Sequence, residues 1–236
     1  MESSITRFDS RFEGVTFKMV DPSMDEEVKD FLWKHHFTEE PVRRSLGIKR
    51  NPFFDKTRLD EALKDRSSMA AVDRNGRLLA VRLGKVARKS DRTKKSANEI
   101  SGLCSPELSQ DARSVRNVKI VTKLRVERLE YDVLKFFDEY NCTTIYEAMG
   151  VCSSREHGIR GLGSELVRRC EEVSKQRGCT HAIVLTTTKY SKIAFEALGY
   201  TCLKTLPYCT FVNSKGELYL KDTREHTEAA SFIKKY

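Results

Sequence analysis

The sequence lacks any long apolar run and any leader-like start. Among its 236 residues there is no stretch of roughly 18 apolar side chains, the minimum for a membrane-spanning helix. Residues 1–14 also lack the apolar segment that a secretion signal requires. We therefore expect a soluble, cytoplasmic protein without a membrane partner.

Paired cysteine motifs and metal-ligand spacings are also missing. The seven cysteines include no Cys-x-x-Cys pair, and the five histidines have no spacing typical of a zinc site. We expect neither a disulfide framework nor a metal cofactor. Cys152 and Cys202 fall in apolar strand-like runs and Cys170 on an apolar helical stripe. A free thiol in such a place usually acts as a small hydrophobe.

Charged residues, in contrast, are abundant and unbalanced. Lys and Arg number 43 against 34 Asp and Glu, which gives a formal net charge of +9. Such a surface attracts anions, whether a polyphosphate cofactor, a nucleic acid or an acidic membrane. No nucleic-acid motif or aromatic-interleaved basic patch is present, so no specific nucleic-acid partner is expected. The length fits one domain over residues 1–236, and we expect a monomer.

Hydrophobic periodicity predicts alternating strands and helices. Strand-like runs fall at 15–20, 69–72, 78–84, 143–152, 182–185, 200–212 and 230–233, with 218–220 expected to pair with 200–212 as a hairpin. Helical spacing is found at 23–37, 53–64, 112–140, 162–177 and 190–198. This order predicts a mixed α/β sheet covered by helices. Residues 85–110 are polar and basic and predict a long, flexible exposed loop.

A glycine turn, Gly158-Ile159-Arg160-Gly161-Leu162-Gly163-Ser164, follows the strand predicted at 143–152. Unpaired N–H groups at a helix start and the helix dipole favour an anion, and glycines let it approach the backbone closely. Gly-Lys-Ser/Thr is absent, and Leu166 stands where a Rossmann fingerprint needs its third glycine. The turn is thus either a pyrophosphate site of another kind or a device for tight strand-to-helix packing.

The strand, turn and helix resemble the R/Q-x-x-G-x-G/A signature of the GNAT superfamily of N-acetyltransferases, except that Gly158 takes the place of the first Arg or Gln. The resemblance implies acetyl-CoA as acyl donor and a mostly antiparallel central sheet flanked by helices. It also implies donor contacts from the turn, from the strand before it and from a later helix, at Met149, Val151, Gly158, Arg160, Gly161, Leu162, Gly163, Ser164 and Ser191.

Two further segments are similar to insect arylalkylamine N-acetyltransferases. His36-Phe37-Thr38-Glu39-Glu40-Pro41 looks like the F-x-x-E-P segment of that family, and residues 184–200 look like its later strand and helix ending in L-G-F/Y. The resemblance implies that Glu40 is the general base, with Glu39 as the competing assignment. Pro41 would fix the turn that aims Glu40. His226 would line the amine pocket together with Glu39 and Pro41.

The leaving thiolate poses a separate question. Many superfamily members protonate it with a tyrosine five residues before the final aromatic of L-G-F, where this chain has Phe195. The resemblance points to Ser191 as the replacement, with Thr187 and Tyr190 as weaker choices. A serine at a helix start is equally an ordinary N-cap. The developing oxyanion would be bound by a backbone N–H between Met149 and Val151.

The main hypothesis is acetyl transfer to the primary amine of a small molecule, either an arylalkylamine or a polyamine-like or agmatine-like amine. The alternatives are a protein or peptide N-acetyltransferase and a non-catalytic module that binds acyl-CoA or nucleic acid. An enclosed pocket rimmed by Phe37, Tyr208 or Phe211 would indicate a small substrate, and an open groove would indicate a protein.

Overall fold

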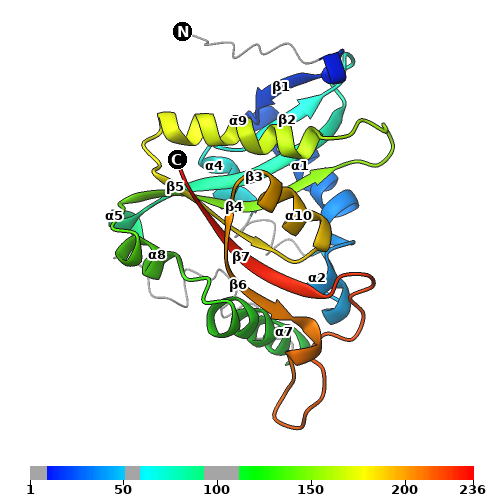
Figure 1. Ribbon diagram of the computed structural model, residues 1–236. Coiled ribbons are helices and arrows are strands. Elements are labelled where there is room, and N and C mark those ends of the chain that lie inside the picture. The colour runs from blue at the N-terminus through cyan, green and yellow to red at the C-terminus, as the bar shows by residue number, and fades with distance from the viewer. Residues whose placement is uncertain (1–9, 51–58, 93–111) are drawn as a thin grey trace.

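A seven-stranded sheet forms the centre of the molecule, in the order β1-β2-β3-β4-β5-β7-β6 (Figure 1). The computed structural model describes residues 10–50, 59–92 and 112–236. The strands are β1 (Thr16–Met19), β2 (Met69–Val72), β3 (Leu78–Arg88), β4 (Thr144–Ser153), β5 (His181–Thr186), β6 (Thr201–Pro207) and β7 (Glu228–Lys235). All neighbours are antiparallel except β4 and β5. The mixed, mostly antiparallel sheet expected from the sequence is confirmed.

Helices cover both faces of this sheet (Figure 1). They are α1 (Asp25–Leu32), α2 (Pro41–Leu46), α4 (Asp60–Lys64), α5 (Lys89–Arg92), α7 (Ala112–Thr122), α8 (Val133–Glu139), α9 (Leu162–Gln176) and α10 (Lys189–Ala197). One face packs against α9 and α10. The other packs against α1 and α4 at one end and against α7 and α8 at the other.

Burial on both faces explains the apolar run of β5. Ala182 and Val184 belong to the cluster under α9 and α10, whereas Ile183 belongs to the cluster under α7 and α8. A strand covered on both sides has no polar face, so its sequence does not alternate.

The single long helix expected at 112–140 is wrong. The segment consists of α7, a π-helical stretch at Lys123–Arg128, and α8. Glu130 adopts a left-handed φ of 49°, which an α-helix cannot contain. Asp132 then starts α8 as its N-cap, because its side chain accepts a 2.9 Å hydrogen bond from the amide of Leu134.

The loop expected at 85–110 is wrong at its start. Residues 85–88 complete β3, where Val86 and Ala87 are both buried, and residues 89–92 form α5. Residues 93–110 lie outside the described part of the chain. In the C-terminal region β6 pairs with β7, and 218–220 contributes only an isolated bridge from Leu218 to Val212.

The cysteines behave in two ways. Cys152 and Cys170 are buried, as expected for small hydrophobes. Cys202 is exposed, because β6 is the edge strand of the sheet. The six described cysteines are free thiols, and Cys104 lies outside the described residues. None of the described helices is long and apolar enough to cross a bilayer.

Candidate active site

The glycine turn connects β4 to α9 and leaves the first amides of the helix without a side-chain cap. Gly161 is the N-cap residue, with a left-handed φ of 85°, and its side chain supplies no acceptor. Gly158 is also left-handed, with φ 68°. Both glycines and Arg160 are exposed at the surface. Uncapped amides, a helix dipole and an accessible cation form an arrangement suited to a phosphate group.

Gly163 holds this helix start tightly against β4. A Cβ atom on Gly163 would lie 3.3 Å from Cγ2 of Val151 and 3.6 Å from the hydroxyl oxygen of Ser153. The two interpretations of the turn are a pyrophosphate site and a device for tight packing, and at Gly163 tight packing does require a glycine. It does not account for the exposed, left-handed Gly158 and Gly161, which pack against little.

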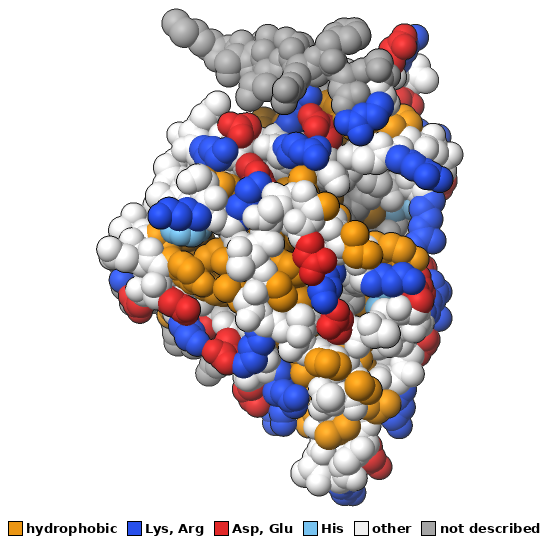
Figure 2. Space-filling view, in the orientation of Figure 1, with side chains coloured by type: hydrophobic (Ala, Val, Ile, Leu, Met, Phe, Trp, Pro, Cys, Tyr) orange, Lys and Arg blue, Asp and Glu red, His pale blue; other side chains and the backbone are white. Residues whose placement is uncertain are grey.

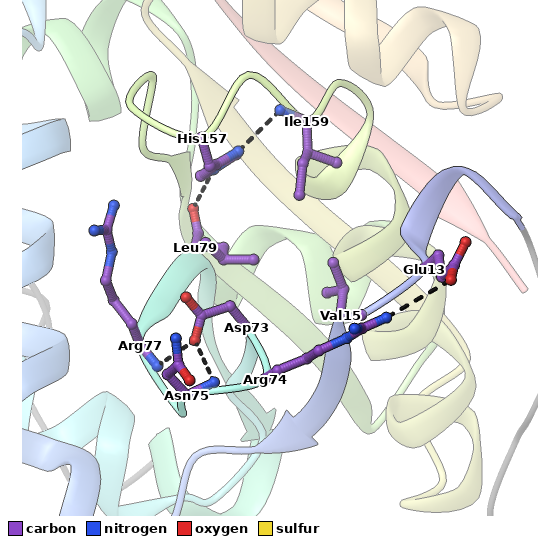
Figure 3. A pocket seen from close by; sticks show the side chains of 10 residues that line it. Glu13, Val15, Asp73, Arg74, Asn75, Arg77, Leu79, His157 and Ile159 are labelled. Atoms are coloured by element: carbon purple, nitrogen blue, oxygen red, sulfur yellow. Dashed lines mark hydrogen bonds and ion pairs between the residues drawn. The ribbon is translucent and has the colours of Figure 1, made fainter.

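His157 clamps the turn from behind, as Figure 3 shows. Its Nδ1 accepts a 3.0 Å hydrogen bond from the amide of Ile159, so Nε2 carries the proton that it shares at 2.9 Å with the carbonyl oxygen of Leu79. A shallow hollow of about 380 Å³ lies beside this clamp. Its two arginines already have carboxylate partners, Arg74 with Glu13 at 3.6 Å and Arg77 with Glu156 at 3.4 Å.

On β4 a bulge precedes the turn and ends the pairing with β5. A register shift opposite β3 leaves Met149 as an extra residue. The parallel ladder with β5 ends where Ala148 pairs with Val184, and beyond that point β4 is paired only with β3 in the described residues. The β5-facing edge of the backbone from Met149 to Val151 is thus free of strand partners.

His36 faces this bulge from the helical side. It belongs to a π-helical turn at Trp33–Phe37 that follows α1, and its Nε2 would lie 3.4 Å from a Cβ atom on Gly150. Burial lowers the pKa of His36 to about 4; the Glu40 carboxylate opposes this shift and Arg43 adds to it. The imidazole is therefore neutral at pH 7. The sequence placed His36 only within the F-x-x-E-P segment and gave it no role.

Glu40 caps α2. Its two carboxylate oxygens accept hydrogen bonds from the amides of Val42 at 3.1 Å and Arg43 at 2.7 Å. Pro41 occupies the first helical position, where its fixed φ suits a helix start, and it is buried. The half-buried Glu40 lies close enough to His36 for its charge to act on the imidazole pKa.

Glu39 points elsewhere. It is exposed and forms an ion pair with Arg224, which lies in the segment before β7. This ion pair links the glutamate segment, residues 36–41, to the segment that contains His226. It also leaves Glu39 in solvent, where a carboxylate has little electrostatic influence on a buried site.

At the start of α10 the cap role that the sequence left open for Ser191 belongs to another residue. Thr188 is the N-cap, and its hydroxyl accepts a 3.1 Å bond from the amide of Ser191. The Ser191 hydroxyl donates to the carbonyl oxygen of Thr188 at 3.0 Å. The carbonyl oxygen of Thr187 accepts a 2.7 Å bond from the Tyr208 hydroxyl. Ser191 is therefore not needed as a cap.

Tyr208 is bonded to the loop before α10 through Thr187, and it lies near enough to Glu40 for the two groups to interact electrostatically. Burial, together with the charges of Glu40 and Glu228, raises the pKa of Tyr208. Phe37, Tyr208 and Phe211, the aromatics expected to rim an enclosed pocket, are all buried, and the hollow beside His157 is lined by other residues.

His226 is buried rather than solvated. Its Nδ1 accepts a 3.4 Å bond from the amide of Lys189, and its ring packs edge-on against Tyr190 at 5.7 Å. It thus supports the first turn of α10. Within the described ranges no cluster of three His, Cys, Asp or Glu side chains could hold a metal ion.

The chain is similar to known acetyltransferases in sequence over one segment and in fold over most of its length. Residues 131–200 match the acetyltransferase (GNAT) family. No curated protein sequence matches the chain significantly. The crystal structure of arylalkylamine N-acetyltransferase 2 from Aedes aegypti has a TM-score of 0.79 at 19% identity, covering 94% of this chain and 98% of that one.

Two other solved structures have similar folds. The polyamine N-acetyltransferase of Drosophila melanogaster has a TM-score of 0.74 at 17% identity, with 94% of this chain and 100% of that one covered. An agmatine N-acetyltransferase mutant in its apo form has a TM-score of 0.75 at 16% identity, with the same coverage. The fold and the matched segment define an acyltransferase. The match to the acetyltransferase (GNAT) family covers residues 131–200, and over the rest of the chain the likeness to these acetyltransferases is one of fold.

Proposed function

We propose that this protein transfers an acetyl group from acetyl-CoA to the primary amine of a small molecule, with Glu40 as general base. The observation that carries the proposal is the convergence of two distant segments on one strand. Gly150, in the β4 bulge, contacts His36, which feels the charge of Glu40, on one side, while Val151 contacts the first turn of α9 on the other. A donor held at the turn would thus have its thioester beside a carboxylate.

The turn fits the pyrophosphate of such a donor. The uncapped amides at the start of α9 supply donors, Gly158 and Gly161 give access, and Arg160 supplies the cation that the atypical first position lacks. The unpaired edge of β4 offers a backbone N–H between Met149 and Val151 to the thioester oxygen, where negative charge develops during attack.

Proton removal is the task assigned to Glu40. An amine near neutral pH is mostly an ammonium ion, and it must lose a proton before it can attack the carbonyl carbon. Neutral His36 lies against the bulge and within reach of the Glu40 charge, so it can accept or pass on a hydrogen bond in this path. Pro41 holds the start of α2 and so keeps the carboxylate in place.

The acceptor amine is proposed from the neighbours. The three similar structures are named for arylalkylamine, polyamine and agmatine acetylation, and all are small amines. We assign Glu39, Pro41 and His226 to the amine side of the site, and Thr187 and Ser191 to the side of the leaving thiolate. Glu39 pairs with Arg224, and His226 supports the first turn of α10.

The charge pattern favours catalysis over nucleic-acid binding. On the face shown in Figure 2, Lys and Arg side chains are interspersed with Asp and Glu, without a broad surface of one sign. Nucleic-acid binding proteins concentrate positive charge on one face or stripe.

The test is a turnover screen. Purified protein would be incubated with acetyl-CoA and, in turn, arylalkylamines, diamines, agmatine-like amines and peptides, and release of the free thiol would be followed. We expect turnover with at least one small amine and much less with peptides. Binding of CoA without turnover of any acceptor would instead indicate a non-catalytic acyl-CoA module. Turnover confined to peptides would indicate a protein acetyltransferase.

A further inference from the structure

Arg82, on β3, is buried and lacks any hydrogen-bond partner. The side chain is 1% exposed, and none of Nε, Nη1 and Nη2 has an acceptor within the described part of the chain. A guanidinium stays protonated in proteins, so burial cannot neutralise it. A buried cation without a counter-charge is strongly unfavourable, which indicates that the charge of Arg82 has a function.

Arg82 lies on the strand next to the β4 segment at which we place the acyl group. It is paired across the sheet with Val151, the residue that contacts Gly163 at the start of α9. Its guanidinium carbon is 5.3 Å from the ring centre of Phe195 on α10 and 5.9 Å from that of Tyr146. The charge thus sits behind Phe195 of α10, near Tyr146 of β4 and Cys170 in the middle of α9.

Four titratable groups around Arg82 carry no negative charge at pH 7. The tyrosines and the cysteine near it are Tyr146, Cys170, Tyr200 and Tyr236. Burial raises the pKa of each of them, that of Cys170 to about 11, so all four are neutral at pH 7.

One carboxylate, Glu171 on α9, is also near. Its Oε2 is 2.7 Å from the ammonium group of Lys234 and forms an ion pair with it, while Oε1 has no partner. Lys234 in turn lies 5.3 Å from the ring centre of Tyr200. The cluster therefore holds two cations and one carboxylate, and one positive charge remains uncompensated.

We propose that Arg82 stabilises the thiolate that leaves when the donor loses its acyl group. The inference rests on the proposed function. In that step the amine nitrogen bonds to the carbonyl carbon, the C–S bond breaks, its electron pair stays on sulfur, and Glu40 takes the amine proton. Arg82 acts across Phe195 without touching the donor, because a charge acts over several ångströms in a low-dielectric interior. A thiolate stabilised in this way does not need the missing tyrosine acid.

Arg82 is too deeply buried to serve the pyrophosphate. That group would lie at the exposed turn, where Gly161 and Arg160 face solvent. Of the anionic groups of the donor, only the sulfur anion that forms at the thioester would lie on the other side of Phe195 from Arg82.

The experiment compares the binding of CoA with that of desulfo-CoA by calorimetry, from pH about 7 to about 10, a range that brackets the pKa of a free thiol. Wild-type protein should prefer CoA increasingly as pH rises, because the bound sulfur becomes an anion. Arg82→Met should reduce this preference roughly tenfold, the effect of one pKa unit. Arg82→Lys, which keeps the charge, should retain most of it.

A preference that does not rise with pH in the wild type, or that survives in Arg82→Met, would overturn the proposal and leave Arg82 as a structural partner of Glu171. If Arg82→Met does not fold, the wild-type and Arg82→Lys titrations still decide. Absence of any CoA binding would contradict the proposed function itself, whereas binding and turnover without the pH-dependent preference would contradict only this inference.

Discussion

The imidazole of His36 lies against Gly150: a Cβ atom on that glycine would lie 3.4 Å from Nε2 of His36. The contact joins the turn after α1 to the β4 bulge. Because the histidine is held there in its neutral form, its protonation state is coupled to folding.

Stability should therefore fall as the pH drops from 6.5 towards about 4. The pKa of His36 is lowered from 6.5 to about 4 in the folded protein, mainly by burial. Between these values the unfolded chain binds a proton that the folded protein excludes, so the free energy of unfolding rises with pH across this window. The change should be about 1–3 kcal/mol. Urea unfolding at a series of pH values would measure it.

His36→Gln is the control, because it removes the titration and keeps a polar side chain. The pKa values of His35 and His181 are also lowered, mainly by burial, so a smaller slope should remain in the variant. Identical pH slopes in wild type and variant would show that His36 is protonated equally in both states.

Glu40→Gln should reduce kcat/KM for the best amine by roughly 10²–10⁴-fold, the usual contribution of a positioned base. The amide keeps one acceptor oxygen for the start of α2, so stability should change by no more than about 1 kcal/mol. Steady-state kinetics and thermal unfolding would separate the two effects.

Glu39→Gln is the matched control for Glu40. Glu39 is exposed and paired with Arg224, so its loss should change kcat/KM by less than about threefold. A larger effect at Glu39 than at Glu40 would exchange the two assignments.

Local patterns predicted the parts of the fold that depend on local chemistry. The glycine turn, α9 and β5 follow from backbone freedom and hydrophobic periodicity, and their placement agrees with the structure. The break before α8 was missed because it depends on a left-handed Glu130, although glutamate favours helices. Asp132, a preferred N-cap residue, was the local signal that could have shown it.

Interactions between distant segments could not be predicted in this way. The insertion of β7 between β5 and β6 is a long-range pairing without a local pattern. Arg82 lies in an apolar run, where a single charge usually indicates the solvent-facing side of a strand. The role of His36 depends on Gly150, more than a hundred residues away, and that of Tyr208 depends on its bond to the Thr187 carbonyl, across the helix α10 and the strand β6 in sequence.

Gly84→Ala should destabilise the protein by about 1–3 kcal/mol, the range for overpacking a core. A Cβ atom at Gly84 would overlap the buried ring and hydroxyl of Tyr146 and lie 3.0 Å from the carbonyl oxygen of Glu147. In Gly150→Ala, on the adjacent strand, the added Cβ atom would contact only His36, at an ordinary contact distance. Its free energy of unfolding should therefore lie within about 0.5 kcal/mol of that of the wild type. Chemical denaturation of both variants would test the contrast, and equal losses would contradict the steric argument.

The clamp at His157 gives a prediction about donor affinity. His157→Phe removes both the bond to the Ile159 amide and the bond to the Leu79 carbonyl, so the glycine turn loses its support. We expect acetyl-CoA to bind roughly tenfold more weakly, in line with about 1 kcal/mol for each of these two hydrogen bonds and some compensation by solvent. Calorimetric titration would measure the loss, and kcat at saturating donor should change little.

Two conservative variants divide the clamp into its parts. The side-chain oxygen of His157→Asn lies where Nδ1 does and can accept from the Ile159 amide, whereas His157→Gln can reach the Leu79 carbonyl with its amide. If the turn conformation governs affinity, Asn should restore most of the binding and Gln less. Restoration by Gln alone would mean that anchoring to β3 matters more than the shape of the turn. Wild-type affinity in His157→Phe would show that the glycines hold the turn without the imidazole.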